Sequence, residues 1–509
     1  MASTAVQPAT LPSAPVAAGQ PDPAVFVIFG ATGDLAQRML LPALYRLVRD
    51  RVVPENFAVV GFARRPMSHD EFREFIRDAL SKYLGPLEDE GWQRMASRLY
   101  YACGEFTQAA DYQSLCALLP QVERDHGTQG NRIFYLSAPP STYEEILTTL
   151  GKTGLVRPGP REGGVSRIVI EKPFGHDQDS SRQLNGLVAE VLGEENIFRI
   201  DHYLGKETVQ NMLVFRFANS IWEPVWNRRY VDHVEITFAE DIGVGRRGRF
   251  YEEVGVVRDV VQNHMFQMLA IIAMEPPAIF DADGFRNEKA KVLRAIRPLG
   301  PEDAVRGQYG PGLVGGQRVP GYRQEPDVSP TSTTPTYAAL KLYIDSWRWA
   351  DVPFYLRAGK RLGDKDGEVV VVFRQPPLQL FRDYDFRDME SNALILKTTY
   401  DEGIQLRFGA RVPGHRREIR SLSLDFTYAS VGEAEHSAYE HLLLEAMRGD
   451  QTLFARRDEV ELQWDIVDPL LAYWAAAPPK DFPNYAAGTW GPAAANELMR
   501  RDGRQWRIG

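Results

Sequence analysis

The chain contains little cysteine and little histidine, and it lacks any long apolar run. Of its 509 residues, two are cysteines, Cys103 and Cys116, and nine are histidines. Neither a Cys-x-x-Cys nor a His-x-x-x-His pair occurs, so the common zinc spacings are excluded and we predict no metal. Two isolated thiols are typical of a reducing compartment, and we expect a cytoplasmic protein. No apolar segment reaches the ~20 residues that cross a bilayer, so we expect no membrane partner.

Positive charge is not concentrated anywhere in the sequence. The 59 basic and 68 acidic residues give a formal net charge of −9, and the basic residues are scattered. Because nucleic-acid-binding surfaces are strongly basic, we expect no nucleic-acid partner. Hydrophobic residues at 44% and charged residues at 25% are usual for a globular protein. A chain of this length exceeds one ordinary core, which predicts two or more domains.

Residues 1–23 differ in composition from the rest of the chain. They contain five prolines and one charged residue, Asp22. No basic residue opens the segment and the prolines interrupt any apolar run, so it does not resemble a signal peptide. Such a segment cannot bury enough apolar surface to fold, and we expect a disordered tail.

A glycine-containing turn follows the first apolar run. Val25–Phe29 is β-rich, Gly30-Ala-Thr-Gly-Asp-Leu-Ala36 follows, and Met39–Val48 has the pattern of an amphipathic helix. Strand, turn and helix in this order indicate the opening of a dinucleotide-binding βαβ unit. Gly30 permits the tight turn, and Gly33 lets the backbone approach a pyrophosphate. The helix N-terminus then offers free N–H groups to the anion.

The next predicted strand, 57–61, leads to arginines where an NAD site usually has an acid. Arg64 and Arg65 follow it in Phe62-Ala-Arg-Arg-Pro66. An acid at this place holds the ribose 2′-hydroxyl of NAD, whereas arginine can pair with the 2′-phosphate of NADP. We therefore predict NADP, with NAD as the weaker alternative. Arginines that only face solvent are the other interpretation.

The nine residues Arg199-Ile-Asp-His-Tyr-Leu-Gly-Lys-Glu207 gather unlike polar groups around one glycine. Lys206 and His202 can face a phosphate, and Tyr203 can donate to it. Asp201 can accept from a hydroxyl or orient a second histidine. This set suits a small, phosphorylated, polyhydroxylated ligand. A salt-bridged surface turn is the alternative from this window alone.

His264 shares a predicted helical face with apolar residues. Val260 and Val261 precede it by four and three positions, and Met268 follows by four, which is helical spacing. One interpretation is a buried histidine with a structural hydrogen bond. The other is a general base screened from bulk water, because histidine titrates near neutral pH.

Together these stretches resemble the glucose-6-phosphate dehydrogenase family. The matching segments, in the family's order, are Gly30–Ala36, Gly61–Arg64, Ile133–Pro140, Glu171–Gly175, Arg199–Glu207, Arg258–His264 and Arg357–Lys360. The resemblance implies oxidation of D-glucose 6-phosphate at C1 to 6-phospho-D-glucono-1,5-lactone, with hydride transfer to NADP⁺. That reaction is the first step of the oxidative pentose phosphate pathway. A homodimer or homotetramer is also implied.

The resemblance assigns roles to particular residues. His264 is the implied general base, and Asp201 orients it, as in a catalytic triad. The implied substrate-binding residues are Lys172, His202, Tyr203, Lys206, Glu240, Asp259 and Lys360. The implied cofactor-binding residues are Gly30, Thr32, Gly33, Asp34, Leu35, Arg64 and Lys172. The bond between Lys172 and Pro173 is of the type that can be cis.

The hydrophobic pattern predicts an α/β fold of two kinds of sheet. Strands are expected at 25–29, 57–61, 132–136, 167–171 and 196–201, with helices such as 69–83 and 141–150 between them. Longer alternating runs follow at 229–238, 337–345, 369–373, 393–399 and 422–426. We therefore predict an N-terminal Rossmann-like dinucleotide-binding domain, 24–201, and a large β+α domain with a mainly antiparallel sheet, 202–509. Residues 307–336 should form a long ordered connection, and 433–474 should be mostly helical.

Three positions depart from the family's pattern. Gln37 stands where a lysine is common, Thr399 where a glutamine is common, and Pro335 where we expect an acid. Lower substrate affinity or broader cofactor choice would follow. Two alternatives stay open: a non-catalytic sensor that binds a sugar phosphate and NADP, and a dehydrogenase of another sugar phosphate or of free glucose. The second structural NADP site of animal members is not predicted.

Overall fold

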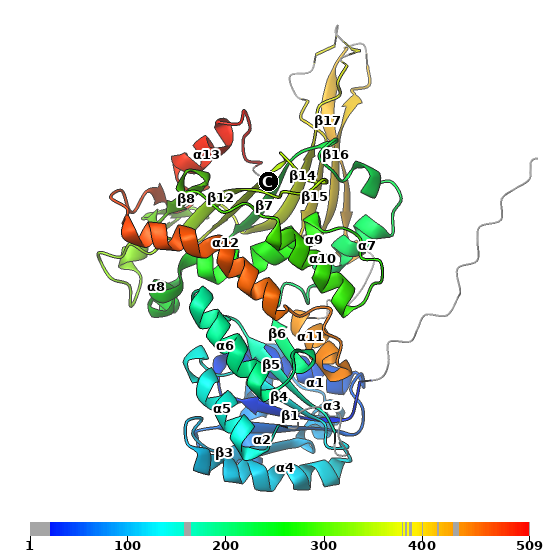
Figure 1. Cartoon of the computed structure of the whole chain (residues 1–509), viewed down its shortest axis with the longest axis vertical. Coiled ribbons are helices and arrows are strands. Elements are labelled where there is room, and N and C mark those ends of the chain that lie inside the picture. The colour runs from blue at the N-terminus through cyan, green and yellow to red at the C-terminus, as the bar shows by residue number, and fades with distance from the viewer. Residues whose placement is uncertain are drawn as a thin grey trace, which may run out of the picture. The chain divides into compact units, whose positions relative to one another are not determined.

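The computed structural model describes residues 21–507 except 157–163, 379, 382–383, 386–388, 400, 415–416 and 431–436 (Figure 1). By its contacts the chain divides into two compact units. The first holds residues up to 169 together with 443–450, and the second holds 170–442 and 451–509. The predicted boundary at residues 201 and 202 falls later than this division and stays a prediction. The predicted disordered tail lies outside the described residues, apart from its last three.

The first sheet is the predicted parallel sheet. Its strands are β1 Ala24–Phe29, β2 Phe57–Ala63, β3 Leu99–Cys103, β4 Arg132–Leu136, β5 Ser166–Glu171 and β6 Ile197–Ile200. They lie in the order β3-β2-β1-β4-β5-β6, and β1 pairs in parallel with both β2 and β4. Every residue of β1 is buried, which explains its unbroken apolar sequence. The prediction of a Rossmann-like sheet is confirmed.

Helices connect these strands. They are α1 Leu41–Arg49, α2 His69–Leu84, α3 Asp89–Ala96, α4 Tyr112–His126, α5 Tyr143–Thr153 and α6 Gln178–Val191. The chain is already helical from Asp34, earlier than the predicted start at Met39, because a π-helical turn, η1 Ala36–Leu40, precedes α1. Ser68 begins α2 with a capping box, in which its side chain and that of Glu71 satisfy each other's backbone N–H.

The second sheet has eight strands and is mainly antiparallel, as predicted. The strands are β7 Val231–Ala239, β8 Ala304–Gly307, β12 Tyr337–Tyr343, β13 Pro353–Gly359, β14 Asp366–Phe373, β15 Ala393–Lys397, β16 Gly403–Arg411 and β17 Ile419–Thr427. Their order is β17-β16-β15-β14-β7-β13-β12-β8. Only the central pair β7 and β13 is parallel among these described strands.

The remaining helices follow in sequence. They are α7 Glu207–Phe217, α8 Gly248–Val256, α9 Phe266–Ala273, α10 Ala282–Arg294, α11 Ala438–Arg448, α12 Arg457–Ala476 and α13 Ala493–Arg500. Most of α11 belongs to the first unit. Figure 1 shows α9, α10 and α12 along one face of this sheet. Val234, Ile236 and Phe238 of β7 are buried, and as alternate residues they share one face of that strand. A π-helix, η7 Val257–Met265, joins α8 to α9. None of the helices in the described part of the chain has an apolar stretch sufficient to span a membrane.

The segment 307–336 contains short strands. They are β9 Tyr309–Gly310, β10 Gly312–Val314 and β11 Gln317–Val319. β10 pairs with β11, and β9 pairs with β18 Tyr485–Ala486 near the C-terminus. Three strands of the large sheet, β8, β13 and β16, had no counterpart among the predicted strands. Pro353 and Arg357 interrupt the apolar pattern of β13, and the glycines of β16 weaken its strand signal although Ile404, Leu406 and Phe408 alternate there.

Candidate active site

A cavity of about 570 Å³ opens within the second unit, a size typical of small-molecule sites. It is lined by Lys172, His202, Tyr203, Phe238, Ala239, Glu240, Asp241, Ile242, Arg247, Asp259, Val260, His264, Lys360, Lys365, Asp366 and Thr399. Most of the predicted catalytic and substrate-binding residues are therefore brought together. Asp201 and Lys206 do not line this cavity, but each contacts residues that do.

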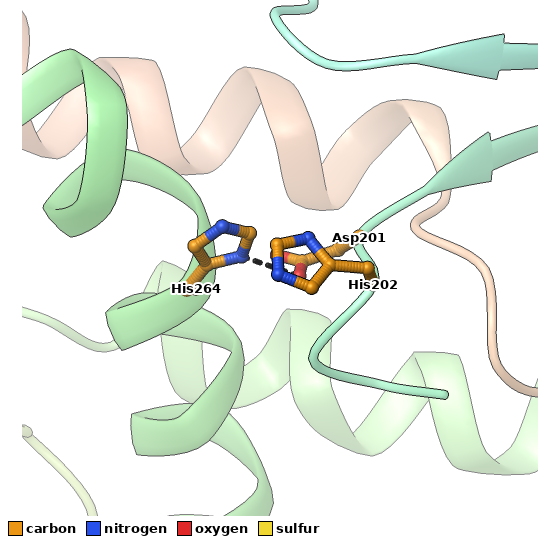
Figure 2. A group of neighbouring side chains, drawn as sticks. All are labelled: Asp201, His202 and His264. Atoms are coloured by element: carbon orange, nitrogen blue, oxygen red, sulfur yellow. Dashed lines mark hydrogen bonds and ion pairs between the residues drawn. The ribbon is translucent and has the colours of Figure 1, made fainter. Parts of the chain in front are cut away.

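The chain leaves β6 at Ile200 and coils tightly before α7 begins. The N–H of Leu204 donates to the Asp201 carbonyl at 3.0 Å, and the N–H of Lys206 donates to the Tyr203 carbonyl at 3.1 Å. This turn holds Asp201 and His202 beside η7, which carries His264 (Figure 2).

His264 and Asp201 form a buried pair. Nδ1 of His264 lies 2.5 Å from Oδ1 of Asp201, and the two residues are 3% and 2% exposed. Burial opposes the charged form of Asp201, but His264, His202 and Lys172 outweigh it and bring its pKa down to about 2. Burial lowers the pKa of His264, although Asp201 favours its protonated form. At neutral pH the carboxyl group is ionised and the imidazole is neutral.

Lys172 forms a hydrogen bond with the other nitrogen of the His264 ring. Its Nζ lies 2.8 Å from Nε2 of His264 and donates to the Asp259 carbonyl at 2.8 Å. An ammonium group only donates, so Nε2 carries the lone pair and Nδ1 carries the proton given to Asp201. The peptide bond between Lys172 and Pro173 is cis.

Two aromatic rings flank His264. The ring centroids of His202 and Tyr203 lie 4.6 and 4.4 Å from that of His264, and Tyr203 stacks on Phe238 at 4.8 Å. Burial lowers the pKa of His202 well below its ordinary value, and His264 and Lys172 lower it further. His202 is therefore neutral in the free protein. It offers a ligand a hydrogen bond, and the cations in and beside the cavity supply positive charge.

Asp201, His202 and His264 are also the described residues whose geometry comes closest to a metal site. Their ligand atoms lie within 4.8 Å of one another (Figure 2). Asp201 and His264 already share a hydrogen bond through two of these atoms, so we interpret the group as proton-transfer machinery. The predicted lack of a metal stays a prediction.

Ion pairs, a hydrogen bond to the backbone and a ring contact hold the remaining predicted substrate residues. Nζ of Lys360 donates to Oε1 of Glu240 at 2.6 Å and lies 3.9 Å from Oδ2 of Asp259. Burial raises the pKa of Asp259, but Lys172 and Lys360 outweigh burial and lower it. Nζ of Lys206 donates to the Thr398 carbonyl at 2.9 Å and lies 4.7 Å from the centre of the Tyr203 ring.

Nine lining residues were not among the predicted site residues, and five of them are polar: Asp241, Arg247, Lys365, Asp366 and Thr399. Lys365 and Asp366 follow Lys360 closely in sequence, but spacing alone does not indicate a cavity. Thr399 is one of the positions at which the chain departs from the family's pattern. Its buried hydroxyl has no hydrogen-bond partner within the described part of the chain, which leaves it available to a ligand. The neighbouring Tyr400 lies outside the described residues.

The predicted cofactor turn lies in the first unit. Gly30 has a φ of 81°, and a Cβ there would come within 2.1 Å of the Ser137 carbonyl oxygen, so only glycine fits. The Gly33 N–H donates to the Gly30 carbonyl at 2.8 Å, and the Gly30 N–H donates to the Phe62 carbonyl at 2.8 Å. The second bond brings the turn next to the end of β2, after which Arg64 is exposed.

Of the other predicted cofactor residues, Thr32 and Leu35 are half-buried and Asp34 is exposed. Asp34 pairs with Arg38 at 3.4 Å. Gln37, the departure in this turn, donates from Nε2 to the Thr32 carbonyl at 2.8 Å. Lys172 belongs to the second unit.

Proteins of one family resemble the chain over nearly its whole length. The chain matches the family models for the glucose-6-phosphate dehydrogenase NAD binding domain over 27–211 and the C-terminal domain over 213–507. It is 44% identical to glucose-6-phosphate 1-dehydrogenase of Chlamydia muridarum, covering 98% of both chains. It is 45% identical to glucose-6-phosphate 1-dehydrogenase 2 of Mycobacterium bovis, covering 95% of this chain and 94% of the relative.

Two solved structures share the fold. A glucose-6-phosphate dehydrogenase in complex with its substrate glucose-6-phosphate aligns with a TM-score of 0.87 at 33% identity, over 96% of this chain and 100% of that chain. Glucose-6-phosphate 1-dehydrogenase from Mycobacterium avium aligns with a TM-score of 0.79 at 37% identity, over 96% and 99%. Since both family models match in order and relatives align over nearly their full length, the chain belongs to the glucose-6-phosphate dehydrogenase family.

Proposed function

We propose that the protein oxidises D-glucose 6-phosphate at C1 to 6-phospho-D-glucono-1,5-lactone, the first step of the oxidative pentose phosphate pathway. The observation that carries the proposal is the buried pair of His264 and Asp201 beside a cavity lined by lysines. A sensor would need only to bind its ligand, whereas a neutral imidazole with its lone pair directed at the cavity is suited to proton transfer.

His264 is the proposed general base. When bound, a nicotinamide cofactor would supply the acceptor for the hydride that leaves C1 of the sugar. The O1 proton passes to Nε2 of His264 as the C1 carbonyl forms. Asp201 stabilises the resulting imidazolium through Nδ1. Because Lys172 occupies Nε2 in the free protein, the O1 hydroxyl displaces its ammonium group, which then stays beside the reacting carbon.

The proposed phosphate site lies at His202, Tyr203 and Lys206, with Lys360 also directed at the cavity. Lys206 and Lys360 provide the charge that a dianion needs, and the two rings provide hydrogen bonds. Glu240 and Asp259 hold Lys360 and Lys172, so the same acids can accept from sugar hydroxyl groups once the lysines shift to the ligand.

We infer NADP as the preferred cofactor, and the turn at Gly30 next to Arg64 supports a nucleotide there. Arg64→Ala should raise the KM for NADP⁺ about 10- to 100-fold, because a charge-assisted hydrogen bond contributes about 1.5–3 kcal/mol. The KM for NAD⁺ should change less than about twofold, since NAD⁺ has no 2′-phosphate.

Initial rates of cofactor reduction with glucose 6-phosphate, with NADP⁺ and NAD⁺ in parallel, test both the reaction and the cofactor. Arg124→Ala, an exposed arginine on α4, is the matched control. Equal effects of Arg64→Ala on both cofactors would exclude a 2′-phosphate contact. Binding of the sugar phosphate without turnover would favour the sensor alternative.

We propose that the protein forms a homodimer or homotetramer. On the outermost strand, β17, Leu422, Leu424 and Phe426 are 49%, 61% and 42% exposed, and alternate residues share one face. Such an apolar row marks an interaction surface. Leu424→Glu should lower the mass measured by light scattering after size exclusion. Ile279→Glu, 69% exposed outside that strand, should not. An unchanged mass for Leu424→Glu would place the interface elsewhere.

A further inference from the structure

The turn that carries His264 is wound more widely than an α-helix. Residues Val257–Met265 form the π-helix η7. Gly255, at φ 61° and ψ 176°, lets the chain pass from α8 into it, and that conformation is open almost only to glycine. Single π-helical turns are rare and are frequent at functional sites. Since the winding sets the direction of each side chain, it also sets where the imidazole ring points.

Asn263 joins the two ends of this wide turn. Its Nδ2 donates to the Arg258 carbonyl at 2.9 Å, and its Oδ1 accepts from the His264 backbone N–H at 2.7 Å. Arg258 lies five residues earlier, which is the spacing of a π-helix's own hydrogen bonds. Asn263 is only 5% exposed, so water competes little for these bonds.

The three nitrogen atoms of His264 contact three different side chains. Asn263 holds the backbone N–H, Asp201 holds Nδ1 and Lys172 lies at Nε2. Asn263 does not itself line the substrate cavity formed by the described residues. Its direct link to a residue that lines the cavity is the bond from the His264 backbone N–H.

We propose that Asn263 is a positioning residue, which fixes the backbone of His264 so that the ring reaches Asp201 and the cavity at the same time. This inference rests on the proposed function, because it deepens the role of the same base. Loss of the amide lets the π-helical turn relax, and a displacement of about 1 Å at a reacting group can cost on the order of 100-fold in rate.

The test compares Asn263→Ala with Gln262→Ala. Gln262 is the preceding residue, equally buried at 3%, and its amide nitrogen has no hydrogen-bond partner within the described part of the chain. Asn263→Ala should lower kcat about 10- to 100-fold, while the KM and the calorimetric Kd for glucose 6-phosphate change less than about threefold. Gln262→Ala should stay within about threefold of the wild-type kcat.

The pH profile separates positioning from a general loss of stability. The titratable groups that face His264 are Asp201, His202 and Tyr203 after β6, Lys172 after β5, and Asp259 on η7. Asp201 raises the pKa of His264, so loosening that contact in Asn263→Ala should move the acid limb of kcat/KM to lower pH. Asn263→Asp keeps the acceptor for the His264 N–H and adds a negative charge next to the His264 backbone, so the acid limb of its pH profile should move to higher pH.

The inference would be overturned if Asn263→Ala kept the wild-type kcat and the wild-type acid limb of kcat/KM. It would also be overturned if Gln262→Ala lost as much kcat as Asn263→Ala. If Asn263→Ala does not fold, the acid limb of kcat/KM is measured in Asn263→Asp. A shift to higher pH would support the inference, and an unchanged limb would overturn it. Histidine-labelled protein allows the same test by NMR titration of His264, assigned with His264→Asn. Wild-type protein that fails to oxidise glucose 6-phosphate would remove the proposed function, and the inference would then be judged on the NMR titration alone.

Discussion

Replacing His264 with asparagine is expected to lower kcat roughly 10³- to 10⁴-fold while glucose 6-phosphate still binds. Asparagine can keep a donor near Asp201, so the buried carboxylate retains a partner. It offers no group that takes up a proton near neutral pH, so the O1 proton loses its acceptor. Steady-state rates measure the loss of turnover, and calorimetry with glucose 6-phosphate measures the retained binding.

The variant Asp201→Asn and the double variant that combines it with His264→Asn show whether Asp201 and His264 act as a unit. Residues of one catalytic group are strongly non-additive. The double variant should therefore be about as slow as His264→Asn alone. His176→Asn, a change at an exposed histidine, is the control. An active His264→Asn protein would remove the proposed base, and multiplicative losses would show that Asp201 acts independently.

The second large effect is expected from Lys206→Ala. The ammonium group of Lys206 lies beside Tyr203 and donates to the Thr398 carbonyl. A small rotation of the side chain is therefore enough to direct it at a phosphate bound near Tyr203. Losing one charged hydrogen bond to a dianion costs about 1.5–3 kcal/mol. The KM for glucose 6-phosphate should therefore rise about 10- to 100-fold.

Free glucose provides the internal comparison for this variant. It has no phosphate, so its apparent KM should change less than about twofold in Lys206→Ala. Lys291→Ala removes a largely exposed lysine that is paired with Glu288 on α10 and should leave both substrates unaffected. Equal effects on glucose and glucose 6-phosphate would rule out Lys206 as a phosphate contact and favour another substrate.

The sequence indicated the dinucleotide-binding opening well because its signals are local. A buried strand, a glycine turn and a helix follow one another within about twenty residues, and each has its own composition rule. The π-helical start before α1 was not predicted, because the apolar pattern of a π-turn is too short to distinguish from that of an α-helix. β13 was missed for a different reason.

Arg357 explains why β13 was not predicted from the sequence. It is 1% exposed, yet a charged residue in a strand usually argues for an exposed face. Its Nε donates to the Thr237 hydroxyl, its Nη2 donates to the Arg507 carbonyl, and its guanidinium lies 4.6 Å from the centre of the Trp506 ring. All three partners are distant in sequence, so only the folded sheet and the C-terminal segment explain the burial.

The sequence by itself determined the fold class, the family and the residue types of the site, because these depend on short strings and on hydrophobic period. The tertiary structure decided how those residues meet. Asp201 and His264 lie 2.5 Å apart through their side chains although 63 positions separate them. Only that packing makes His202 neutral, places Lys172 on Nε2 and brings Arg247 and Thr399 to the cavity. The reason is that burial and charge proximity are properties of space, and sequence spacing does not encode them beyond a single helix or strand.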